Sequence, residues 1–132
     1  MPPNTNPIFE LTVVSAGVQL TSTNTTDLQS VMTAGGNGTR IDGIFCSTDD
    51  TSAVNLAFYI NDNGTDDWYI GNVLVPTGSG YTTVARVDAL ATLGIGSPKY
   101  LLLTQNYALK VACVATMTAG KTTTILVVGG DY

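Results

Sequence analysis

The chain has 132 residues, a net charge of -5 and no histidine, and only 11% of its residues are charged, against about 25% in typical soluble domains. A single domain of this length can bury a substantial core without disulfides, and so little charge predicts a surface that is neutral or covered by partners. The five Lys and Arg residues stand singly along the chain, which argues against a nucleic-acid partner, and no apolar stretch approaches the roughly 20 residues of a membrane span.

Residues 1–7 differ in composition from the rest of the chain. The stretch MPPNTNP holds three prolines and no apolar periodicity, which predicts an extended arm. In a polyproline-like conformation such an arm would reach about 20 Å. It also lacks the basic start and apolar centre of a secretion signal, so we expect the protein to be made in a reducing cytoplasm. Residues 8–132 are expected to form one domain.

The first half of that domain predicts short strands separated by turn signals. Strands are expected at residues 8–20, either continuous or interrupted at Gly17, at residues 28–34 and at residues 39–48. The clearest alternation follows, where one face of a strand carries Val54, Leu56, Phe58 and Ile60. A face that is apolar at every second residue is expected to belong to the core.

The dipeptide Asn63-Gly64 lies between that strand and another at residues 68–75. Both residues tolerate the positive φ of a tight turn, so the pattern predicts a β-hairpin. With regular alternation, Trp68 shares a face with Ile70 and Leu74, which favours a core or subunit-interface position for the indole ring. Trp68 and the six tyrosines also leave open a carbohydrate-binding module, in which exposed rings stack on sugars.

The second half of the domain is less uniform. Residues 81–96 fit either a short helical face or a strand followed by a turn, and the pattern does not decide between them. Further strands are expected at residues 100–104, 107–117 and 122–132. About eight or nine strands at spacings near 8 to 12 residues predict an all-β fold, an antiparallel β-sandwich or a jelly-roll-like barrel.

Groups that could carry chemistry are sparse. The absence of histidine removes Ser-His-Asp and Cys-His activation of a nucleophile and the commonest transition-metal ligand. Cys46 and Cys113 each lie in an apolar run, which favours buried free thiols. Nine of the ten acidic residues are Asp, mostly in turn contexts. The DNGTDD stretch at residues 62–67 lacks the EF-hand pattern, although a looser calcium site stays open. We expect no enzymatic activity and no cofactor.

The order of these features resembles small virion proteins of tailed bacteriophages, most of all their head-decoration or cement proteins. The resemblance spans nearly the whole chain and lies in feature order rather than in one motif. After the arm come, in turn, GVQLTSTNTTDLQSVMTAGGNGTRIDGIFCSTDDTSAVNLAFYINDNGTDDWYIGNVLVP, the Gly-rich TGSGY, the Leu-rich ALATLG and the terminal hairpin YALKVACVATMTAGKTTTILVVGGDY.

This resemblance implies a β-sandwich subunit, often a homotrimer, that docks on the outer surface of the phage head and stabilises the shell. Its partner would be the major capsid protein, and the protein would be made in the bacterial host cytoplasm. A tail, baseplate or head-fibre structural protein is the alternative. The residues expected to contact a partner lie in the arm and at the end of the terminal strand: Pro2, Pro3, Asn4, Asn6, Pro7, Asp131 and Tyr132.

Overall fold

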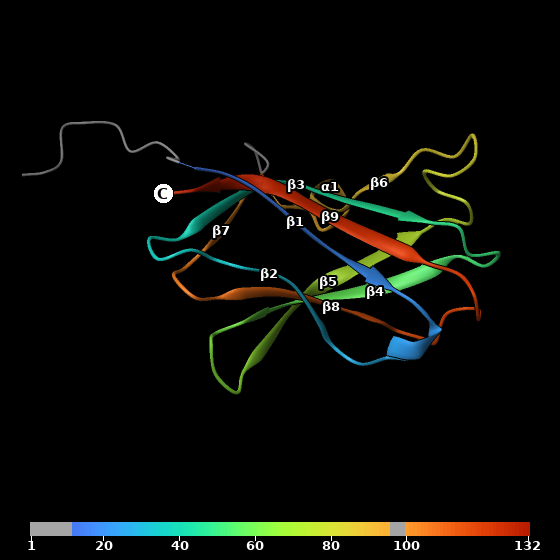
Figure 1. The fold of residues 1–132 in the computed structure, drawn as a ribbon, viewed down its shortest axis with the longest axis horizontal. Helices are drawn as coiled ribbons and strands as arrows, with labels where there is room; N and C mark the ends of the chain where they lie inside the picture. Colours follow the sequence, from blue (N-terminus) through green and yellow to red (C-terminus); the bar gives the residue numbers. More distant parts are fainter. Residues whose placement is uncertain (1–11, 96–99) are drawn as a thin grey trace, which may run out of the picture.

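Two antiparallel β-sheets packed face to face make up the domain (Figure 1). The structure is a computed structural model, and it describes residues 12–95 and 100–132. The sheets do not close into a barrel, so of the two expected architectures the protein adopts the β-sandwich. The expected arm at residues 1–7 lies outside the described residues.

The first sheet, called sheet A, has the strand order β1-β9-β3-β6, with β7 also paired to β3. Its strands are β1 (Thr12–Leu20), β3 (Thr39–Thr48), β6 (Val87–Asp88), β7 (Leu101–Leu103) and β9 (Thr123–Asp131). Sheet B has the order β2-β8-β4-β5. Its strands are β2 (Gln29–Thr33), β4 (Val54–Asn61), β5 (Asp67–Val75) and β8 (Ala108–Cys113). The short helices are η1 (Ser22–Asn24) and α1 (Ala89–Thr92).

The hairpin expected at Asn63-Gly64 is confirmed, because β4 and β5 pair as antiparallel neighbours, with Asn61 opposite Asp67. Asn63 takes the positive φ that the turn needs, at 64°. The connecting loop is longer than a two-residue turn, and the Asn61 side chain holds it. Its amide donates to the Gly64 and Asp66 carbonyls, at 3.3 Å each, and to Asp67 Oδ1 at 2.8 Å.

The first strand runs through Gly17 without a break. Its register with β9 is continuous from Thr12 to Leu20, which settles the alternative that the pattern left open. Glycine is needed there because a Cβ on Gly17 would lie 2.8 Å from the Ile125 carbonyl oxygen. The residue therefore permits a close approach of two backbones instead of interrupting the strand.

Two segments of the second half differ from the expected pattern. Within residues 81–96, a two-residue strand, β6, is followed by the single-turn helix α1, so both expected elements occur in shortened form. Asp88 Oδ1 caps that helix by accepting from Ala91 N at 3.4 Å. The strand expected at residues 107–117 was wrong in its length, since β8 ends at Cys113. Met117 nevertheless remains buried, because the loop after β8 turns it back onto the core.

The core lies between the two sheets and follows the expected alternation. Leu56 and Phe58 of β4 are fully buried against Ile44 of β3 and Ile125 of β9 within one hydrophobic cluster. Each such aliphatic or aromatic side chain contributes roughly 1.5–3 kcal/mol by leaving water. Both cysteines are buried and free, as expected from their apolar surroundings.

A β-bulge in β5 contradicts the shared face expected for Trp68 and Leu74. The register shifts so that Phe58 pairs with Gly71 and Tyr59 with Tyr69, which leaves Ile70 as the extra residue. Side chains before and after the bulge therefore change face, and Trp68 and Leu74 lie on opposite sides of the sheet. Trp68 is not a core residue, since 48% of its surface is exposed. Its ring packs edge-on against that of Tyr107, 5.7 Å away.

Candidate binding surface

The outward face of sheet A carries apolar side chains from four strands, of which Val13, Leu102 and Leu126 are exposed and Phe45 and Val128 are half-buried. Pairing places Leu126 of β9 beside Phe45 of β3, and Val128 beside Gly43. Val13 and Leu102 lie on the same face, at the two ends of a row in which Gly130 and Arg40 lie between them. Val13 is 88% exposed, Leu102 55% and Leu126 38%. This apolar face consists of Val13, Phe45, Leu102, Leu126 and Val128.

Two arginines accompany the apolar face, Arg40 within it and Arg86 against Phe45, and each makes a cation-π contact. The guanidinium carbon of Arg86 lies 4.4 Å from the centroid of the Phe45 ring, and that of Arg40 lies 5.2 Å from the centroid of Tyr100. Arg40 Nε also donates to Asp42 Oδ1 at 2.9 Å. Exposed apolar side chains combined with aromatic rings and arginine are typical of protein–protein interfaces.

The end of β9 holds the two residues that sequence reasoning assigned to partner contact. The Asp131 carboxylate accepts a hydrogen bond from the Thr39 hydroxyl, and that hydroxyl oxygen accepts from Gly35 N at 3.0 Å. A Cβ on Gly35 would lie 2.9 Å from the Asp131 carboxylate. Asp131 therefore joins β9 to the loop between β2 and β3 and contributes to the fold. Whether it also contacts a partner stays a prediction.

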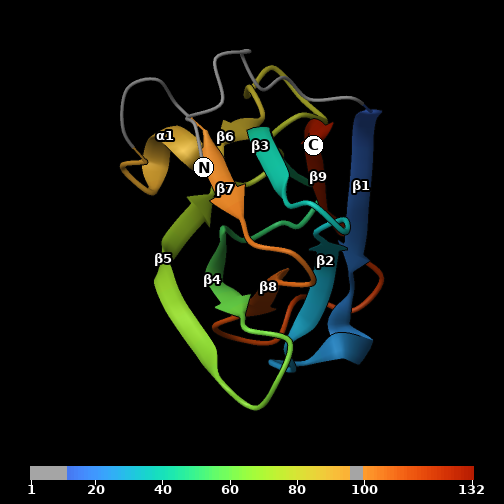
Figure 2. The same cartoon turned by 90° about the vertical axis from the view of Figure 1, so that its left-hand side faces the viewer.

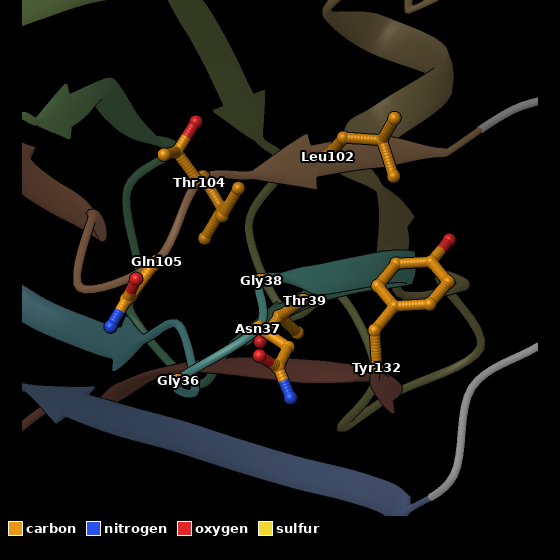
Figure 3. A pocket seen from close by; sticks show the side chains of 9 residues that line it. Gly36, Asn37, Gly38, Thr39, Leu102, Thr104, Gln105 and Tyr132 are labelled. Atoms are coloured by element: carbon orange, nitrogen blue, oxygen red, sulfur yellow. The ribbon is translucent and has the colours of Figure 1, made fainter. Parts of the chain in front are cut away.

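Tyr132 lies at the rim of an open pocket (Figure 3). Its backbone N–H donates to the Gly38 carbonyl at 3.2 Å, which fixes the residue beside the β2–β3 loop. The pocket has a volume of about 440 Å³ and lies between that loop and the segment from β7 toward β8. Besides Tyr132, its lining side chains include Asn37, Leu102, Thr104 and Gln105.

A second pocket, of about 420 Å³, lies beside the buried carboxylate of Asp50, which is 2% exposed. Asp50 Oδ1 accepts from the Thr118 hydroxyl at 2.7 Å and from Ser52 N at 3.0 Å, and Oδ2 accepts from Thr118 N at 3.0 Å. Burial on its own would raise the pKa of Asp50, but these hydrogen bonds outweigh it and lower the pKa. Asp50 thus joins the β3–β4 loop to the β8–β9 loop as an anion.

The two thiols are not poised for chemistry. Burial, with a smaller effect from the charge of Asp88, raises the pKa of Cys46 to about 12. Burial, followed by the charge of Asp50, also raises the pKa of Cys113. Because the thiolate is the reactive form, both groups are held in their unreactive state at neutral pH.

The acidic loop at residues 62–67 is organised by hydrogen bonds within the loop. Asp62 Oδ1 accepts from Asp66 N at 3.4 Å, in addition to the contacts of Asn61 described above. Within residues 12–95 and 100–132, no group of three or more His, Cys, Asp or Glu is placed to hold a metal ion. Turn formation accounts for these aspartates.

Sequence reasoning named the arm and the end of β9 as partner contacts, and it did not name the apolar face. The arm residues Pro2, Pro3, Asn4, Asn6 and Pro7 lie outside the described residues. The apolar face was missed, although β9 carried a signal for it. Residues 125–128 are apolar at four consecutive positions, so both faces of the strand are apolar, and a strand that faced water on one side would alternate instead.

No family model, no curated protein and no solved structure matches the chain. Among the helices in the described part of the chain, none is long and apolar enough to cross a membrane.

Proposed function

We propose that this protein is a non-enzymatic structural protein of a tailed-bacteriophage virion, a decoration protein that binds the outer surface of the head and stabilises the shell. The apolar face carries the proposal. A β-sandwich with a water-exposed outer sheet would place polar side chains there, whereas Val13, Leu102 and Leu126 are each more than a third exposed. The low charge of the chain and the resemblance in feature order support the same assignment.

In this proposal the apolar face contacts the major capsid protein, and the arm residues 1–7 clamp a neighbouring capsid subunit. Each contact is modest, and repetition over the shell multiplies it into a large total stabilisation. The protein acts in several copies. The resemblance implies three copies, whereas the unpaired edge of sheet A at β1 favours pairs.

Co-sedimentation with empty heads of the phage that encodes the chain tests the proposal. The wild-type protein should sediment with the heads and saturate at a fixed ratio to the capsid protein. Leu126→Glu places a charge in the apolar face and should weaken binding at least tenfold. The matched control is Leu74→Glu, which introduces the same charge at a 58% exposed leucine of sheet B and should bind like wild type.

Removing residues 1–7 gives an independent test of the clamp. The truncated protein should keep the circular dichroism spectrum of a folded sandwich and should bind empty heads more weakly than the full chain. Absence of wild-type sedimentation with heads would overturn the proposal. Immunogold labelling of intact virions on the tail or baseplate would then favour the tail-protein alternative.

The Tyr132 pocket favours one second candidate, a carbohydrate-binding module. The Tyr132 ring and the Leu102 side chain both line the pocket and offer apolar surface for a sugar ring, and the amides of Asn37 and Gln105 offer hydrogen-bond donors and acceptors (Figure 3). A glycan array with the wild-type protein and with Tyr132→Ala tests this candidate. Binding that the variant loses would support it, and an array without hits would remove it.

A further inference from the structure

The sandwich has one long edge strand that lacks the usual protection against further pairing. Strand β1 pairs with β9 on one side along its full length. Among the residues that the structure describes, no strand pairs with its other side. Figure 2 shows β1 at the rim of the molecule. The outer side of such a strand presents a row of backbone N–H and C=O groups that can accept another strand.

The other edges of the described sheets are blunted in the ways that usually prevent such pairing. Strands β6 and β7 have only two and three residues. Strand β2 has five residues and a register shift between Ser30 and Met32. Strand β5 has a bulge at Ile70, next to Gly71 with its φ of 150°, and begins with the charged Asp67.

Strand β1 has none of these features. Its sequence, TVVSAGVQL, contains no charged residue and no proline over nine residues, and its register with β9 has no shift. Val13, Ser15, Gly17 and Gln19 point outward, because their partners on β9 alternate with the buried Ile125 and Val127. A regular, uncharged strand of this length is well suited to pair with another strand.

We infer that β1 is a self-association edge, which pairs antiparallel with β1 of a second copy about a two-fold axis perpendicular to sheet A. The occupant is a second copy because the strand is self-complementary. When β1 pairs with β1 of a second copy, the two strands have equal length, and neither carries a charge that would repel the other. The paired sheets A then form one continuous sheet across both copies.

This arrangement also extends the surface described above. A two-fold axis perpendicular to the sheet leaves the outward faces of both copies on the same side. The dimer therefore presents two copies of the apolar face on one side of the continuous sheet. The inference holds whether or not the protein belongs to a virion.

Sedimentation equilibrium of the full chain between about 5 and 200 µM tests the inference. The wild type should approach twice the 13.7 kDa mass of one chain. The double variant Ser15→Lys, Gln19→Lys places like charges along both paired edges and should raise the dimer dissociation constant at least tenfold. The control Asn72→Lys, Leu74→Lys adds the same charge to outward positions of the edge strand β5 and should associate like wild type.

Hydrogen exchange of the wild-type protein gives a second measurement that needs no variant. Amides of β1 should exchange more slowly at 200 µM than at 5 µM, whereas those of β5 should not change with concentration. A monomer at 200 µM would overturn the inference. So would a mass of three chains, because isologous pairing relates copies two at a time, or unchanged association of the β1 double variant.

Discussion

The buried carboxylate of Asp50 links the β3–β4 loop to the β8–β9 loop, and replacing it tests how much this link stabilises the fold. In Asp50→Asn the side chain keeps its size, and its one remaining oxygen can still accept from Ser52 N and the Thr118 hydroxyl. The new amide group, however, faces Thr118 N, which previously donated to Oδ2 at 3.0 Å, so one donor meets another. A lost hydrogen bond to a charged group costs about 1.5–3 kcal/mol, and Thr118 lies at the pocket, where water can partly replace it. We expect a loss of about 2 kcal/mol.

Urea unfolding followed by the fluorescence of Trp68, the single tryptophan, measures this loss as a change in the free energy of unfolding. A loss of about 2 kcal/mol is a large share of the typical 5–15 kcal/mol of a domain. Asp27→Asn is the matched control, since Asp27 is an exposed loop aspartate, and it should stay within about 0.5 kcal/mol of wild type.

The pH dependence separates this account from a general loss of packing. Folding lowers the pKa of Asp50 from its ordinary value of 3.8. The stabilisation by the anion is therefore complete above about pH 4 and disappears as the pH falls through the lower pKa of the folded state. The difference between wild type and Asp50→Asn should shrink toward pH 2.5. An equal difference at pH 7 and pH 2.5, or one below about 0.5 kcal/mol at pH 7, would refute the reasoning.

The remaining predictions concern the thiols and one close backbone contact. Because burial raises the pKa of both Cys46 and Cys113, a colorimetric disulfide reagent at pH 8 should label neither in the folded protein and both in guanidinium. Fast labelling of either thiol before unfolding would contradict their burial. Gly129→Ala should destabilise by about 3 kcal/mol or more, since its Cβ would overlap the Arg40 carbonyl oxygen. Gly36→Ala, with nothing within 4 Å of its Cβ, should cost less than about 1 kcal/mol in the same thermal or urea unfolding series.

Local patterns predicted the parts of the fold that local forces decide. The strand at residues 39–48 was located to the residue, because turn-forming glycines precede it and β-branched side chains fill it. The hairpin at Asn63 and the burial of both cysteines were likewise available from short windows. Strand order was not, because the pairing of β9 with β1 and β3 joins residues that are distant in the sequence.

The features that the sequence left open or misplaced have a common physical cause, which is contact with neighbouring strands and loops that a pattern in one strand does not contain. Gly17 does not interrupt β1. It is a glycine because a Cβ at this position would collide with the Ile125 carbonyl oxygen of β9. The bulge at Ile70 moves Trp68 and Leu74 to opposite faces, and nothing in an alternating pattern marks an inserted residue. Tyr132 was chosen for its amphipathic ring, but the pocket beside it depends on loops that only the fold brings together.

The central place of β9 in sheet A has a consequence for how the chain folds. This strand is synthesised after all the others described, yet it lies between β1 and β3, two of the earliest. Until residues 123–131 leave the ribosome, β1 lacks its partner strand, and β3 can pair only with the short strands β6 and β7. Pairings of such long sequence separation form slowly, and unpaired strands are prone to aggregate. Assembly of sheet A is therefore expected to be the slow, chaperone-sensitive step, and a nascent chain that stops before β9 should fail to fold.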